Sequence, residues 1–112
     1  MTAVGALARD ASAVMAEATR VMLERIREKG WPIQPGQTPL PWDITHGWCV
    51  DWAEFVCARI PGAVMAEHDD GDMLHTFVVL GGRYYDAECP DGVTHVLRLP
   101  VFTLPSPARP AA

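Results

Sequence analysis

The sequence predicts an α+β fold, in which two helices pack on a small antiparallel sheet of three or four strands. Apolar residues recur at helical spacing in two stretches, residues 4–29 and 48–59. Two runs of strand-forming residues flank Gly81-Gly82, the kind of turn that joins a β-hairpin. The length of 112 residues, 49% of them hydrophobic and 21% charged, is typical of a single globular domain spanning residues 1–112.

The first predicted element is an amphipathic helix within residues 1–30. Its apolar positions alternate in steps of three and four: Val4, Leu7, Ala11, Val14, Ala18, Val21, Met22 and Ile26. Gly30 and the following Trp31-Pro32 end the pattern, because glycine favours a helix C-terminus and proline cannot extend the helix. The stripe alone leaves open whether this helix packs on its own domain or on a partner.

The remaining chain divides into three segments. Residues 31–47 form a loop rich in proline and tryptophan, whose apolar side chains predict that it packs across the domain. Residues 48–104 contain the second helix, ended by Pro61-Gly62, a short strand at 63–66, the hairpin, and a further strand at 93–99. Residues 105–112 are expected to be a flexible tail.

The hairpin register places titratable side chains together. If Gly81 and Gly82 form a two-residue turn, then Asp86 is a diagonal neighbour of His75, and Glu88 stands directly opposite it. These side chains then share one face of the sheet. The sequence therefore offers a histidine that Asp86 can orient, with Glu88 as a second candidate orienter.

Cys49 is the candidate nucleophile for such a histidine. It lies in the first turn of the second helix, where the helix dipole and the free N–H groups favour a thiolate. Gly47 precedes it and would allow a substrate to approach closely. The amide of Cys49 itself could stabilise an oxyanion, and Trp42 and Trp48 could line a substrate groove.

The motifs G-W-C-x-x-W-A and H-T-F-V-V-L-G-G-R-Y-Y-D-A-E resemble those of the transglutaminase-like and papain-like cysteine hydrolases. The resemblance covers roughly residues 45–90. It implies that Cys49, His75 and Asp86 form a catalytic triad, in the order Cys, His, Asp along the chain. It also implies a small hydrolase or acyltransferase that acts on an amide as a peptidase, deamidase or transglutaminase, without a cofactor, on a protein or peptide substrate.

Other interpretations of the same residues stay open. Residues 42–48 lack the glutamine that papain-type enzymes carry before the nucleophile, which favours a non-catalytic protein-interaction module on the same fold. His46 and Cys49 with His75 or Cys89 could bind zinc, although the paired C-x-x-C spacing of structural zinc sites is missing. The acidic turn at 69–72 lacks the remaining ligands of a calcium loop.

Composition narrows the class of protein. A net charge of −5 and the lack of a basic cluster argue against nucleic-acid and anionic-membrane partners. We find no apolar run of transmembrane length and no signal peptide, and the odd number of cysteines argues against a disulfide framework. We therefore expect a cytoplasmic protein, and the frequent alanine, arginine, proline and tryptophan are typical of a bacterial or phage origin. The oligomeric state is left open.

Overall fold

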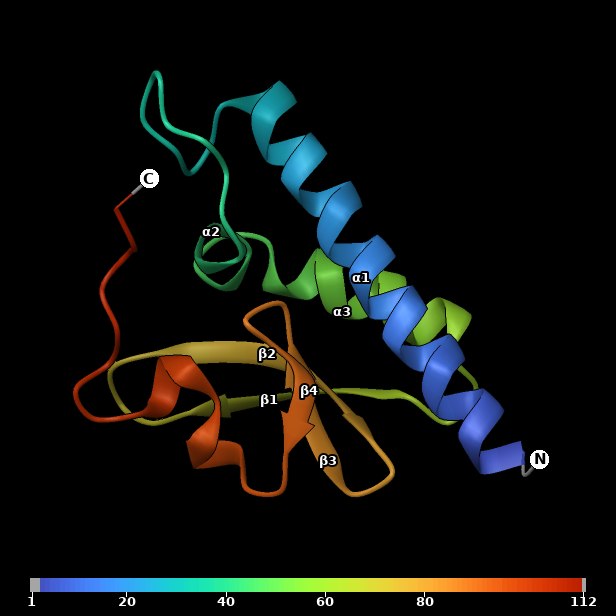
Figure 1. Cartoon of the computed structure of the whole chain (residues 1–112). Coiled ribbons are helices and arrows are strands. Elements are labelled where there is room, and N and C mark those ends of the chain that lie inside the picture. The colour runs from blue at the N-terminus through green and yellow to red at the C-terminus, as the bar shows by residue number, and fades with distance from the viewer. Residues whose placement is uncertain (1–2, 112) are drawn as a thin grey trace.

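In the computed structural model, an all-antiparallel four-stranded sheet is covered by helices (Figure 1). The structure describes the backbone of residues 3–111 and the side chains of residues 10–111. The sheet order is β1-β2-β3-β4, which confirms the predicted α+β class. In chain order the elements are α1 (Ala3–Lys29), α2 (Pro41–Thr45), α3 (Cys49–Arg59), β1 (Val64–Asp69), β2 (Leu74–Leu80), β3 (Arg83–Asp86), β4 (Cys89–Val93) and the short 3-10 helices η1 (Val96–Arg98) and η2 (Pro100–Phe102).

The larger core lies between α1, α3 and the sheet. Met22 and Ile26 of α1 are fully buried and belong to one apolar cluster with Trp52 of α3 and Val78 of β2. The indole N–H of Trp52 donates to the hydroxyl of Thr19 at 3.0 Å, which joins the two helices. The described part of α1 therefore packs on its own domain.

A second, smaller core lies between the sheet and the 3-10 segment. Phe77 of β2 packs with Leu99, Val101 and Phe102, all of which are buried. In Figure 1 this segment lies at the lower left of the sheet, and the three α-helices lie above the sheet and to its right. The sheet is thus covered from both sides, and His75 and Thr76 of β2 are buried, whereas Leu74 before them is exposed.

Three segments differ from the sequence prediction. The strand expected at 93–99 is wrong: β4 ends at Val93, and His95 caps η1 by accepting a hydrogen bond from the Leu97 amide. The first strand is longer than predicted, because its pairing with β2 continues to Asp69. The proline-rich loop contains α2, whose first turn is stabilised by Asp43 accepting a hydrogen bond from the Leu40 amide at 2.8 Å.

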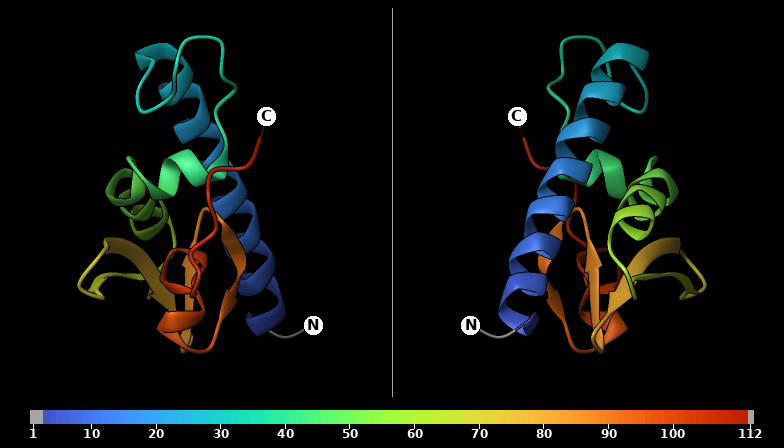
Figure 2. Two further views of the ribbon diagram at one scale, coloured as in Figure 1. Left: turned by 90° about the vertical axis from the view of Figure 1, so that its left-hand side faces the viewer. Right: turned by 90° about the vertical axis from the view of Figure 1, so that its right-hand side faces the viewer.

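The C-terminal segment has a defined position against α2 (Figure 2). The guanidinium of Arg109 donates to both carboxylate oxygens of Asp43 at 2.9 Å, and Asp43 is only 1% exposed. The indole N–H of Trp42 donates to the Pro107 carbonyl at 3.2 Å. Pro107 and Arg109 thus contribute to the surface beside α2, and the flexibility of residues 105–112 stays a prediction.

Candidate active site

Cys49 begins α3, as predicted, and its side chain is partly buried. The short helix α2 and the turn at His46-Gly47 lead the chain into this position, and the Trp48 amide donates to the Ile44 carbonyl at 2.8 Å. A Cβ atom on Gly47 would lie 2.8 Å from the Trp31 ring. Gly47 is therefore required for packing against Trp31. The space next to Gly47 that was predicted for a substrate is occupied by the Trp31 indole.

His75 and Asp86 form a buried pair. Nε2 of His75 donates to Oδ2 of Asp86 at 2.9 Å, and the two residues are 1% and 2% exposed. The hairpin register is the predicted one, with Leu80 opposite Arg83 and Val78 opposite Tyr85. The two-residue turn therefore brings Asp86 within reach of His75, as the sequence analysis expected.

The hydrogen bond to Asp86 leaves the other ring nitrogen of His75 for Cys49. Nδ1 is buried and makes no hydrogen bond of standard distance and angle to the described residues. His75 nevertheless interacts with the Cys49 thiol closely enough to affect the ionisation of both groups.

The pKa values of the pair shift in opposite directions. Burial of the Cys49 thiol opposes ionisation, but the interactions with His75 and with the Thr76 backbone outweigh it and lower the pKa of the thiol. Burial disfavours a charged His75, yet the hydrogen bond to Asp86 and the neighbouring Cys49 raise the pKa of the imidazole to about 9. Both shifts favour a thiolate–imidazolium pair at neutral pH.

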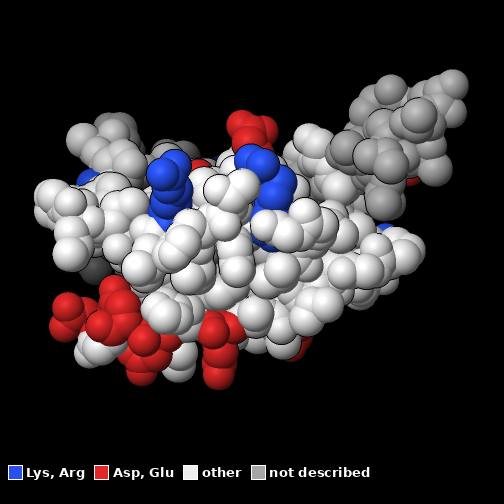
Figure 3. Space-filling view, turned by 90° about the horizontal axis from the view of Figure 1, so that it is seen from below, with Lys and Arg blue, Asp and Glu red and all other residues white. Residues whose placement is uncertain are grey.

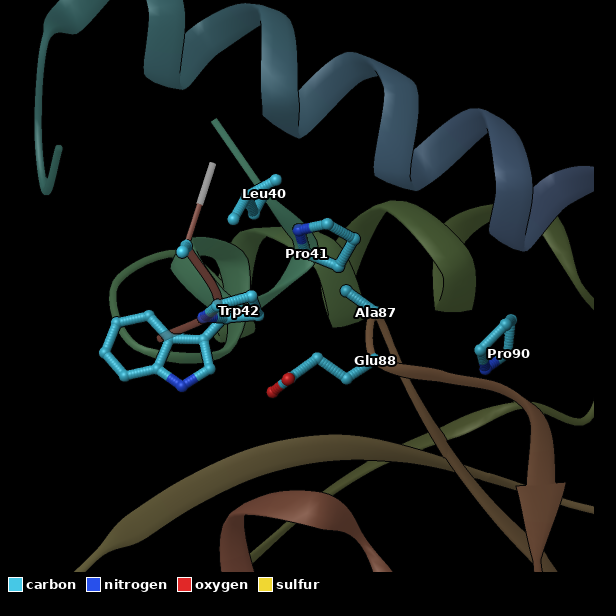
Figure 4. A pocket seen from close by; sticks show the side chains of 8 residues that line it. Leu40, Pro41, Trp42, Ala87, Glu88 and Pro90 are labelled. Atoms are coloured by element: carbon cyan, nitrogen blue, oxygen red, sulfur yellow. The ribbon is translucent and has the colours of Figure 1, made fainter. Parts of the chain in front are cut away.

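Glu88 does not lie opposite His75, because β3 ends at Asp86 and the chain turns through Ala87 and Glu88 into β4. The amide of Glu88 donates to Oδ1 of Asp86 at 3.0 Å. The backbone of Glu88, and not its carboxylate, therefore helps to position Asp86 in the His75–Asp86 dyad. The carboxylate extends toward Trp42 (Figure 4).

A pocket of about 460 Å³ opens next to the dyad, between α2, the β3–β4 turn and the C-terminal segment (Figure 4). We call it the Glu88 pocket, after the residue that supplies its charge; the other lining residues are apolar: Leu40, Pro41, Trp42, Ala87, Pro90, Pro110 and Ala111. Burial and the nearby Asp86 carboxylate raise the pKa of Glu88, while contact with the Thr45 hydroxyl opposes that shift.

The two tryptophans predicted to line a groove have different positions. Trp42 lines the Glu88 pocket and stacks on His46 with ring centroids 3.5 Å apart. The indole N–H of Trp48 instead donates to the carbonyl of Trp31 at 3.0 Å, so Trp48 anchors the 31–47 loop.

The other cysteines lack the environment of Cys49. Burial raises the pKa of Cys57 in α3, and burial together with the Asp86 carboxylate raises that of Cys89 at the start of β4. No group of three or more His, Cys, Asp or Glu side chains within residues 10–111 has metal-binding geometry, so the zinc set with His46 and the acidic calcium-like turn are not assembled. Free thiols are seen at all three cysteines.

The surface carries little positive charge on the face seen in Figure 3, where acidic side chains gather along one border. In the part of the chain that the structure describes, we find no helix of the length and apolar character that a membrane crossing requires.

One contributor to the site was missed by the sequence analysis. The backbone and the side chain of Thr76 both help to lower the pKa of the Cys49 thiol. The sequence could have indicated Thr76, because it is the neighbour of His75 on the same strand.

Comparison of the chain with protein-family models, with curated proteins and with solved structures gave no match.

Proposed function

We propose that the chain is a small cysteine hydrolase or acyltransferase that acts on an amide through an acyl-enzyme on Cys49. The observation that carries the proposal is the arrangement of His75: Asp86 holds Nε2, and the buried Nδ1 is left for the thiol. A histidine oriented by a carboxylate beside a thiol of lowered pKa is the arrangement that nucleophilic cysteine catalysis requires.

The reaction follows from these roles. The Cys49 thiolate attacks the amide carbonyl carbon, forming a C–S bond and an oxyanion that the Cys49 amide, in the first turn of α3, is suited to receive. The C–N bond then breaks, and the nitrogen leaves with the proton of His75. Attack by water or by an amine on the thioester, with His75 accepting the proton, releases the acyl group and restores the thiolate.

The substrate class is an amide in a protein or peptide. Peptide cleavage, deamidation of a glutamine side chain and transfer to an amine share this acyl-enzyme, and they differ in the group that leaves and the group that attacks. The free thiols support a reducing compartment, and hence a cytoplasmic location.

The test is the pH dependence of iodoacetamide labelling, measured at each cysteine by mass spectrometry. Wild-type Cys49 should react rapidly well below pH ~8.5, the ordinary pKa of a cysteine. Near pH 6.5 the His75→Ala variant should react more slowly, by up to about 100-fold, since a thiol of ordinary pKa is only about 1% ionised there. His95→Ala is the matched control, because His95 is an exposed histidine that caps η1.

Loss of the fold must be separated from loss of the base. His75→Gln keeps a polar side chain of similar size, and the urea midpoint of each variant reports folding. A Cys49 that labels no faster than Cys57 in folded wild-type protein, or that is insensitive to His75, would refute the nucleophile and leave the interaction module as the better account.

A further inference from the structure

The Glu88 pocket has a chemical character that the proposed reaction does not use. Its walls are apolar side chains from three parts of the chain: Leu40, Pro41 and Trp42 at α2, Ala87 and Pro90 at the β3–β4 turn, and Pro110 and Ala111 in the C-terminal segment. A single carboxylate, that of Glu88, extends into it (Figure 4). The volume of about 460 Å³ is within the range of pockets that bind small molecules and side chains.

The pocket adjoins the His75–Asp86 pair, because Ala87 and Glu88 directly follow Asp86. The Glu88 amide donates to Asp86, which accepts a hydrogen bond from His75, and His75 interacts with Cys49. Trp42 stacks on His46, three residues before Cys49. The pocket therefore lies beside the residues that hold His75, which is a suitable position for a subsite of the substrate that Cys49 attacks.

We propose that the Glu88 pocket is a specificity subsite for an aliphatic side chain ending in an ammonium group, as in a lysine-containing peptide; this inference rests on the proposed acyl transfer at Cys49. The apolar walls match the methylene stem, and the carboxylate at its end matches the cation. A half-buried carboxylate near Asp86 gains from a positive partner, because attraction to a cation offsets the desolvation and the repulsion that raise its pKa.

The position of the pocket is maintained by the C-terminal segment. Arg109 pairs with the buried Asp43, and Pro107 accepts from Trp42, so Pro110 and Ala111 are held beside α2 as one wall. The guanidinium of Arg109 is committed to Asp43 and to the Thr38 carbonyl. The carboxylate of Glu88 contacts the Thr45 hydroxyl but forms no ion pair with the side chains of residues 10–111, so a cation of the substrate would be its ionic partner.

Binding is tested first without relying on Cys49. The indole N–H signal of Trp42 is followed by NMR during titration with Nα-acetyl-lysine N-methylamide and, separately, with the norleucine analogue, which has the same stem without the ammonium. The lysine compound should shift the signal at about tenfold lower concentration, the effect expected of one charge-assisted hydrogen bond. Glu88→Gln should abolish the difference, whereas Asp91→Asn, at a nearby exposed carboxylate, should retain it.

Reaction rates provide the second readout. Acetyl-lysine and acetyl-norleucine chloromethyl ketones both alkylate a thiolate, with a C–S bond formed and chloride released. The lysine reagent should modify Cys49 about tenfold faster in wild type and at an equal rate in Glu88→Gln, a preference of the size given by one charge-assisted hydrogen bond.

The outcomes separate the two proposals. Fast iodoacetamide labelling of Cys49 together with equal responses to the lysine and norleucine compounds would overturn the subsite and leave the nucleophile intact. Slow iodoacetamide labelling with a lysine preference at Trp42 that depends on Glu88 would retain the binding pocket and refute the catalysis. A preference unchanged by Glu88→Gln would also overturn the subsite.

Discussion

The two ends of α3 each carry a cysteine, and the two thiols have opposite ionisation behaviour. The pKa of Cys49 is lowered by interactions with His75 and Thr76 that exceed its desolvation, whereas burial raises the pKa of Cys57. Cys57 packs on the apolar core shared with α1, whereas Cys49 lies near His75 and Thr76 of β2. Both cysteines belong to the same helix, so their different pKa shifts must come from the elements that each thiol faces.

The largest expected effect separates stability from reactivity. Met22→Ala empties a fully buried position in the α1–α3 core and should lower the free energy of unfolding by about 2–5 kcal/mol, measured by urea unfolding. Under native conditions the labelling rate of Cys49 should change less than about twofold, because its partners lie on β2. Met65→Ala, on the exposed surface of β1, is the matched control and should cost less than about 0.5 kcal/mol. A large drop in Cys49 reactivity in folded Met22→Ala would show that the two ends are not independent.

A second effect sharpens the comparison through pH. The raised pKa of His75 contributes stability that is present below about 6.5, its unfolded value, and is lost as the pH rises through about 9. The lowered pKa of Cys49 contributes stability above the ordinary thiol pKa that is lost as the pH falls through its folded value. The contributions of His75 and Cys49 change with pH in opposite directions, so the wild-type stability should vary less between about pH 6.5 and 8.5 than that of a variant lacking either residue.

Replacing Cys49 should reveal the contribution of His75 to the pH dependence of the free energy of unfolding. In Cys49→Ser the free energy of unfolding should fall by roughly 1–2 kcal/mol between pH 6.5 and 9, since each unit of pKa shift is worth about 1.4 kcal/mol and the contribution of Cys49 to the His75 shift is gone. Cys57→Ser should keep the wild-type profile. Parallel profiles for the two serine variants in urea titrations would contradict the coupling of Cys49 to His75.

The smallest effect concerns the residue that orients His75. Asp86→Asn removes the negative charge that favours the imidazolium, so the His75 pKa, followed by NMR, should fall from about 9 toward 6.5. Cys49 labelling near pH 6.5 should slow by about tenfold, equivalent to about one pKa unit of lost thiolate stabilisation. Glu88→Gln is the comparison variant and should slow labelling by less than about twofold, because Asp86, and not the Glu88 carboxylate, accepts the hydrogen bond from His75. Equal slowing in both variants would restore Glu88 as an orienter.

Local patterns were sufficient for the parts of the site that depend on short-range geometry. The Gly81-Gly82 turn determines the register of β2 and β3, and the register determines that Asp86 can reach His75. The spacing of apolar residues defines α3 and places Cys49 in its first turn. These inferences needed no knowledge of the tertiary fold.

The parts that were missed depend on contacts between distant residues or on weak strand signals. The ion pair of Arg109 with Asp43 joins positions 66 residues apart, for which no local pattern exists. The β4 sequence Cys-Pro-Asp-Gly-Val is poor in strand-forming residues, and Gly92 is required there because a Cβ would lie 2.6 Å from the Tyr85 ring. The early end of β3, which carries Glu88 away from His75, follows from this pairing.

Because Cys49 and Cys57 of α3 have different surroundings, their reactivities should respond differently when α3 separates from the sheet. In most proteins a buried cysteine becomes more reactive when its helix separates from the core, and Cys57 should follow that rule. Cys49 should do the reverse at mildly acidic pH, since separation from β2 returns its thiol to an ordinary, mostly protonated state. The labelling rates of the two cysteines should therefore change in opposite directions. Their ratio would report the fraction of molecules in which α3 is packed on the sheet.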